Sequence, residues 1–123
     1  MSPSVATPNA YRESAVLSAP PEMLIVMLYD GARRYLYQAG VAMGEGQIEL
    51  TNRKLRRAED IIQHLRDSLD FDQGEIANNL ESIYIFCLRQ LRHVRFSRDK
   101  AVLEHVSGLL GQLRESFAAI AQA

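Results

Sequence analysis

The sequence predicts an all-α protein, an antiparallel up-down-up-down four-helix bundle with a mobile N-terminal arm. Apolar residues recur at spacings of three and four along four long segments, the pattern of amphipathic helices. The connections between these segments are short, so consecutive helices are expected to be antiparallel neighbours. A length of 123 residues with 47% apolar and 24% charged residues suits one domain with a real core.

The chain is expected to divide into an arm, residues 1–19, and a helical bundle domain, residues 20–123. The arm combines prolines with several serines and threonines and shows little periodicity, which is typical of a segment that is mobile in isolation. The first helix is expected to begin at Pro21, because proline suits the first turn and Glu22 complements the helix dipole. It runs to about Met43, and its expected inner stripe is Leu24, Leu28, Tyr35, Ala39 and Ala42.

The second helix is expected from about Ile48 to Leu69, and its apolar stripe is narrow. This stripe consists of Leu55, Ala58, Ile62, Leu65 and Leu69. A turn follows, in which Asp72 is a candidate cap for a third helix over about residues 73–96. The inner residues of the third helix are expected to be Ile76, Leu80, Ile83, Cys87, Leu91 and Val94.

The fourth helix is expected to follow a cap at Ser97 or Asp99, because both residue types accept hydrogen bonds from free backbone N–H groups. It runs to about Ile120. Its inner residues are expected to be Val102, Val106, Leu109, Leu113, Phe117 and Ile120.

Two segments are more apolar than one helix face requires. Residues 23–29 and residues 83–88 are apolar at every position, whereas a helix on a core needs a stripe of roughly 100°. In a chain of this size one side of each helix can face the core, so the other side needs a different cover. The arm, a second copy or a client polypeptide could supply that cover, and the excess apolar surface indicates a binding function.

Composition argues against several classes of partner and compartment. The formal net charge is −1, whereas nucleic-acid binding usually leaves a basic excess, so no nucleic-acid partner is expected. No segment of about 18 or more apolar residues is present, so no membrane insertion is expected. The N-terminus has no secretion-signal pattern, and the single cysteine, Cys87, cannot form an internal disulfide. We expect a cytoplasmic protein.

The pattern of reactive residues predicts no enzyme, no metal site and no cofactor. A di-iron bundle needs Glu three residues before an inward His, and none of His64, His93 and His105 has one. No Ser–His–acid spacing and no glycine-rich phosphate loop is recognisable.

The sequence leaves two other functions open. His64 with Arg66 faintly resembles a histidine phosphotransfer module, although the adjacent Asp67 would repel an incoming phosphate. A self-associating helical bundle would bury the apolar excess in a homodimer. A basic series, Arg89, Arg92, Arg95 and Arg98, is expected to be a solvated face with surface ion pairs, or a surface for an acidic partner.

Four segments together resemble the flagellin-specific secretion chaperone family of bacteria. The first is Tyr11 with residues 14–24, and the second, Met-Leu-Tyr-Asp-Gly-Ala at residues 27–32, is the most distinctive. The third covers residues 58–70, and the fourth begins with Ile-Ala-Asn-Asn-Leu and covers residues 76–114. The similarity extends over about residues 11–120 in matching order and spacing.

The resemblance implies a cytoplasmic export chaperone that binds the disordered C-terminal region of flagellin one-to-one and prevents premature polymerisation. It further implies delivery of the chaperone–client complex to the gate of the flagellar type III export apparatus. In this family the arm, with the tyrosine that matches Tyr11, lies over the bundle and is displaced by the client. The chaperone itself is expected to be a monomer or weak homodimer.

The candidate client-binding residues come from the two apolar runs, from the arm and from one helix amide. Apolar side chains of the runs would anchor the client, arm residues would cover the groove in its absence, and an Asn amide would hydrogen-bond client backbone. These residues are Tyr11, Val16, Ile25, Met27, Leu28, Tyr29, Asn79, Ile83, Tyr84 and Leu88.

Overall fold

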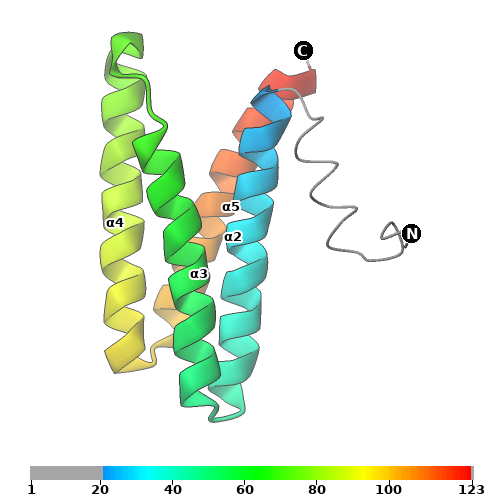
Figure 1. Ribbon diagram of the computed structural model, residues 1–123, viewed down its shortest axis with the longest axis vertical. Helices are drawn as coiled ribbons and strands as arrows, with labels where there is room; N and C mark the ends of the chain where they lie inside the picture. Colours follow the sequence, from blue (N-terminus) through cyan, green and yellow to red (C-terminus); the bar gives the residue numbers. More distant parts are fainter. Residues whose placement is uncertain (1–20, 123) are drawn as a thin grey trace, which may run out of the picture.

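A computed structural model describes residues 21–122, which form four long α-helices and one short 3₁₀ turn (Figure 1). The elements are α2 (Pro21–Gly44), α3 (Ile48–Asp67), η2 (Phe71–Gln73), α4 (Glu75–Ser97) and α5 (Lys100–Gln122). The all-α prediction is confirmed, and each predicted helix end lies within two residues of the observed one. The expected arm, with Tyr11 and Val16, lies outside the described residues.

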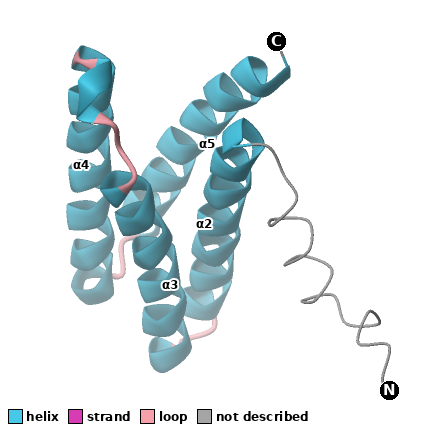
Figure 2. Ribbon diagram, turned by 45° about the horizontal axis from the view of Figure 1, so that its top comes forward, coloured by secondary structure: helices cyan, strands magenta, loops and turns pink. Residues whose placement is uncertain are grey.

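The four helices pack in a ring, so that α3 and α5 both flank α2 and both flank α4. Consecutive helices are antiparallel, as the short connections predict. The packing is not equally tight along the bundle. Figure 2 shows α4 and α5 diverging toward the C-terminal end of α5, whereas they meet at the short connection between them. One end of the bundle is therefore closed and the other is open.

The buried core is almost entirely aliphatic, with two tyrosines. Small residues on α2 and α3, including Ala32, Ala39 and Ala58, are fully buried and allow these helices to approach closely. The larger core side chains come from all four helices. They are Tyr29, Leu36, Leu55, Ile62, Leu65, Tyr84, Cys87, Leu88, Leu91, Val94, Leu103, Val106 and Leu110.

The predicted inner stripe of α3 is confirmed at Leu55, Ala58, Ile62 and Leu65, whereas Leu69 lies half-buried in the turn after α3, and the other three stripes are partly wrong. On α2 the buried residues are Val26, Tyr29, Ala32, Leu36, Ala39, Gly40 and Ala42, so the stripe lies one position away from Leu28 and Tyr35. Ile76 at the start of α4 and Ile120 near the end of α5 are 67% and 60% exposed. Both lie at the open end, where the neighbouring helices diverge and leave no facing surface to bury them.

The turns use the expected residue types at partly unexpected positions. The Asp99 carboxylate accepts hydrogen bonds from the backbone N–H groups of Ala101 and Val102, so the predicted cap of α5 is confirmed. The Asp72 cap is wrong: Gly74, at φ 74°, precedes α4 without a side-chain cap. Asp70 instead caps η2 by accepting from the backbone N–H of Asp72, because the chain turns once more before α4 begins.

The difference in burial between two isoleucines gives a matched stability test. Ile62→Ala empties a fully buried position and is expected to lower the free energy of unfolding by about 2–5 kcal/mol in urea denaturation. Ile76→Ala removes the same atoms from an exposed position and is expected to change it by less than about 0.5 kcal/mol. Equal losses in the two variants would contradict the assigned burial of α4.

Candidate functional site

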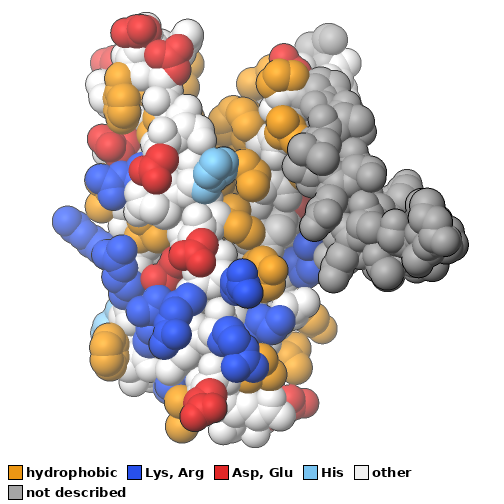
Figure 3. All heavy atoms as spheres, in the orientation of Figure 1, with side chains coloured by type: hydrophobic (Ala, Val, Ile, Leu, Met, Phe, Trp, Pro, Cys, Tyr) orange, Lys and Arg blue, Asp and Glu red, His pale blue; other side chains and the backbone are white. Residues whose placement is uncertain are grey.

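The open end of the bundle contains an apolar groove of about 470 Å³, which we call the end groove. All four helices contribute to it, because the start of α2, the end of α3, the start of α4 and the end of α5 meet there. Figure 3 shows the hollow between the upper ends of α4 and α2, with hydrophobic side chains along its wall. Its lining residues are Pro21, Leu24, Ile25, Leu28, His64, Leu65, Ser68, Leu69, Asp70, Gln73, Ile76, Ala77, Leu80, Tyr84 and Phe117.

The lining is apolar inside and polar at the rim, as expected of a site for an apolar polypeptide segment. Leucines from α2, α3 and α4 form the wall, while His64, Ser68, Asp70 and Gln73 lie on the α3 side. Helix periodicity predicts the same leucines as core residues. Of these leucines Leu65 is buried in the core, whereas the others are half-buried and line a groove because the two halves of the bundle separate at this end.

Two tyrosine hydroxyls lie beneath the end groove and join α2 to α4. Tyr29 and Tyr84 are buried, and their hydroxyls hydrogen-bond each other across the core. The Phe117 ring of α5 stacks on Tyr29, with ring centroids 5.6 Å apart and an interplanar angle of 23°. Burial raises the pKa of both phenols, and it raises the pKa of the nearby Cys87 thiol to about 11. This pair is therefore a neutral, rigid support below the groove.

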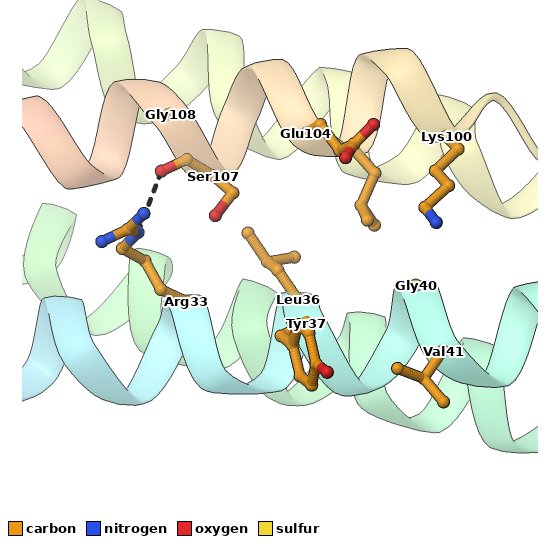
Figure 4. Close-up of a pocket in the computed structure, with 10 residues that line it drawn as sticks. Arg33, Leu36, Tyr37, Gly40, Val41, Lys100, Glu104, Ser107 and Gly108 are labelled. Atoms are coloured by element: carbon orange, nitrogen blue, oxygen red, sulfur yellow. Dashed lines mark hydrogen bonds between the residues drawn. The ribbon is translucent and has the colours of Figure 1, made fainter.

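A second, more polar groove of about 330 Å³ lies between α2 and α5, and we call it the side groove (Figure 4). Leu36, Gly40 and Leu103 contribute apolar surface, and an added Cβ at Gly40 would come within 3.3 Å of Leu103 Cδ2. Arg33 lies at one end, where its Nε donates to the Ser107 carbonyl oxygen over 3.1 Å. Lys100 lies toward the other end, so a cationic side chain lies at each end of this groove.

The candidate residues from the sequence fall into distinct groups in the structure. Ile25 and Leu28 are half-buried and line the end groove, as expected of client anchors. Tyr29, Tyr84 and Leu88 are core residues, and of these Tyr84 also reaches the groove. Three others lie outside the groove lining: Met27 and Ile83 are half-buried and Asn79 is exposed.

Sequence reasoning missed part of the groove as a binding surface. Leu24, Leu80 and Phe117 were expected in the core, and Ile76 as well. The one sequence signal for them is their place within six residues of a helix end, where a bundle is least closed. That signal does not by itself distinguish a frayed end from a groove.

The structure also bears on the open alternatives. Arg66 Nε lies 3.5 Å from the Glu81 carboxylate on α4, whereas His64 lines the end groove on a different side of α3. The basic companion needed for a phosphohistidine is therefore turned away from His64. Within residues 21–122 no group of three His, Cys, Asp or Glu side chains is arranged to hold a metal, and no helix is long and apolar enough to cross a membrane.

Comparison with known proteins identifies the family of this four-helix chain. Residues 4–123 match the family model described as flagellar protein FliS. The chain belongs to the FliS family. It is 37% identical over 107 residues to the flagellar secretion chaperone FliS of Salmonella typhimurium, covering 85% of this chain and 79% of that protein.

More distant FliS relatives align over a similar share of the chain. Flagellar secretion chaperone FliSB of Pseudomonas aeruginosa is 34% identical over 85% of this chain and 84% of its own length. FliS of Bacillus subtilis is 28% identical over 89% of this chain and 81% of its own length. The FliS family is a chaperone family rather than an enzyme family, which confirms both the resemblance and the prediction of a non-enzyme.

The hydrogen bond between the two phenols predicts a strong thermodynamic coupling. Tyr29→Phe or Tyr84→Phe alone leaves one buried hydroxyl without its partner and is expected to cost about 1–3 kcal/mol. The double variant leaves no unpaired hydroxyl. Its loss of unfolding free energy is expected to be smaller than the sum of the losses in the two single variants. Urea denaturation of the four proteins measures the cycle, and simple additivity would contradict the pairing.

The raised pKa values predict a loss of stability at high pH. Above about pH 9 the unfolded chain releases protons from Cys87 and then from the tyrosines, whereas the folded chain retains them. The free energy of unfolding is therefore expected to fall as the pH rises from 9 to 11. Denaturation midpoints measured at intervals across that range test this, and Cys87→Ala is expected to weaken the dependence. A midpoint that stays constant would contradict the burial of these groups.

Proposed function

We propose that this protein is a cytoplasmic export chaperone that binds the disordered C-terminal region of flagellin one-to-one in the end groove. Binding would prevent premature polymerisation, and the complex would be delivered to the gate of the flagellar type III export apparatus. The observation that carries the proposal is an open apolar groove of about 470 Å³ on a member of the FliS family. The relatives quoted above are flagellar secretion chaperones by name.

The physical mechanism is stoichiometric binding without turnover. A disordered segment loses conformational entropy when it folds on the chaperone, so apolar burial has to offset that cost. Leu28 and Leu80 from facing walls, with the exposed Ile76 at the edge, offer anchoring surface for apolar side chains of an amphipathic client segment. The rim residues at the end of α3 and in the turn that follows it would hydrogen-bond polar client groups.

The roles of the candidate residues follow from their burial. Ile25 and Leu28 would contact the client directly, and Tyr84 would do so through the part of its ring that reaches the groove. Tyr29 and Leu88 would act from beneath by holding α2 and α4 in place. Met27, Asn79 and Ile83 would contact client residues that continue beyond the end groove.

The division of the chain is part of the same proposal. Residues 20–123 would be the bundle domain, and residues 1–19 an arm that covers the groove through Tyr11 and Val16 until the client displaces it. The free chaperone would be a monomer or weak homodimer.

Calorimetric titration of the full chain with the C-terminal segment of flagellin from the same organism tests the proposal. We expect one-to-one binding with a sub-micromolar dissociation constant and a negative heat-capacity change, because apolar surface is buried as the client folds. Absence of binding by the folded chaperone would contradict the proposal. Sedimentation of the free chain at increasing concentration would then show whether self-association buries the groove instead.

Two isoleucines in the first turns of their helices provide a matched pair for locating the client. Ile76→Asp places a charge in the end groove and is expected to weaken client binding by about tenfold or more, since a desolvated charge is costly. Ile48→Asp makes the same change at a 60% exposed position outside the end groove and is expected to leave the affinity unchanged. Circular dichroism of both variants checks the fold, and equal effects would place the client elsewhere.

A further inference from the structure

The end of α3 and α4 away from the end groove carries a dense group of arginines. Residues 53–60 of α3 and residues 89–98, the end of α4 with its C-cap residue Arg98, include seven arginines but only two carboxylates. Figure 3 shows basic side chains gathered over the lower part of these helices, with acidic side chains at the upper end of α4. We call this group the arginine face. Its members are Arg53, Arg56, Arg57, Arg89, Arg92, Arg95 and Arg98.

A buried carboxylate holds part of the arginine face in place. Glu59 on α3 is buried and accepts a hydrogen bond from Arg95 Nη2 on α4, while Arg92 Nε lies 3.9 Å from the same carboxylate oxygen. Arg98 Nη1 donates to Asn52 Oδ1 over 3.1 Å. These contacts lock α3 to α4, so the arginine face rests on a rigid two-helix platform rather than on a loop.

The remaining arginines of the face have no acidic partner among the residues that the structure describes. No described carboxylate lies within 4 Å of a guanidinium nitrogen of Arg53, Arg56, Arg57 or Arg89, and all four residues are exposed. Guanidinium groups pair with carboxylates in a planar two-point geometry that lysine cannot provide. The face therefore offers several unused sites of this kind side by side.

The spacing of these groups matches the spacing of side chains on a partner helix that lies along the contact between α3 and α4. Arg53 and Arg56, three residues apart, share one face of α3, and Arg89, Arg92 and Phe96 share one face of α4 at spacings of three, four and seven. Phe96 is 85% exposed, the largest exposed fraction among the big apolar side chains described. Aromatic residues and arginines are the two residue kinds most enriched at interface centres.

We infer that the arginine face is a second docking surface, separate from the end groove, for an acidic helical segment of a protein partner. Carboxylates spaced three and four residues apart on the partner helix would pair with arginines of α3 and α4. An apolar side chain between them would cover Phe96. Because the end groove lies at the other end of the same helices, this partner could bind while the groove is occupied.

A protein segment fits this surface better than a continuous polyanion. Asp60 shares the α3 face with Arg53, Arg56 and Arg57, and Glu49 lies one turn before them. A short partner helix can place its carboxylates between these groups. A lipid headgroup surface or a nucleic-acid backbone presents anionic groups throughout and would be repelled by both carboxylates.

The test is a titration of the full chain with a designed helical peptide of about 20 residues. The peptide carries glutamates at three- and four-residue spacing on one face with a central leucine. A control peptide of the same composition distributes the glutamates around the helix. The one-faced peptide is expected to bind several-fold more tightly, and Phe96→Ala is expected to reduce that preference.

Charge-reversal variants with equal changes in net charge locate the peptide. Arg56→Glu/Arg89→Glu, one substitution on each helix, is expected to weaken binding by about tenfold or more, because repulsion replaces attraction. Arg34→Glu/Lys100→Glu alters two exposed cations outside the face and is expected to change affinity by less than about twofold at physiological salt. Binding of the flagellin segment is expected to be unaffected by the first pair, which separates this inference from the proposed function.

Several outcomes would overturn the inference. Equal affinity for the two peptides, or equal losses in the two double variants, would mean that bulk charge alone attracts the peptide. Tighter binding to phosphatidylglycerol vesicles or to a single-stranded oligonucleotide than to the one-faced peptide would assign the face to a polyanion. Salt-sensitive self-association that Arg56→Glu/Arg89→Glu removes would assign it to the acidic residues 67–81 of a second copy.

Discussion

The hydrogen bond between the hydroxyls of Tyr29 and Tyr84 lies between the closed part of the bundle and its open end. On one side of it the helices enclose an aliphatic core, and on the other side they separate to form the end groove. A buried phenol needs a partner, so each tyrosine fixes the position of the other and thereby the distance between α2 and α4. Phe117 of α5 stacks on Tyr29, so α5 packs against this tyrosine pair as well. The groove thus has a rigid base and diverging walls.

The distribution of side-chain size along α2 explains why one end is closed. Ala32, Ala39, Gly40 and Ala42 are small and buried, so α3 and α5 approach the second half of this helix closely. The first half carries Leu24, Ile25 and Leu28, which are half-buried and line the end groove. The same helix therefore contributes both a tight interface and a binding surface, each made by the residues that suit it.

Charge is distributed along the bundle as unevenly as apolar surface is. The formal net charge of −1 conceals an acidic stretch over residues 67–81 beside the end groove and a basic excess at the other end of α3 and α4. Composition argues correctly against a uniformly basic protein but does not reveal a local arginine face. Burial disfavours the charged form of the Glu59 carboxyl. It raises the pKa of this group more than Arg95 and Arg92 lower it.

The sequence by itself determined the helices, their order, their antiparallel packing and the family. Where a helix has one apolar stripe, as α3 does, periodicity also identified its buried face at Leu55, Ala58, Ile62 and Leu65. Residues 23–29 are apolar on every side, so periodicity could not show that Tyr29 rather than Leu28 faces the core. Only the tertiary structure decided that Ile76 is exposed and that Leu24 and Leu80 line a groove. Whether an apolar side chain is buried depends on how far apart the neighbouring helices lie, and that distance depends on packing between segments far apart in the chain.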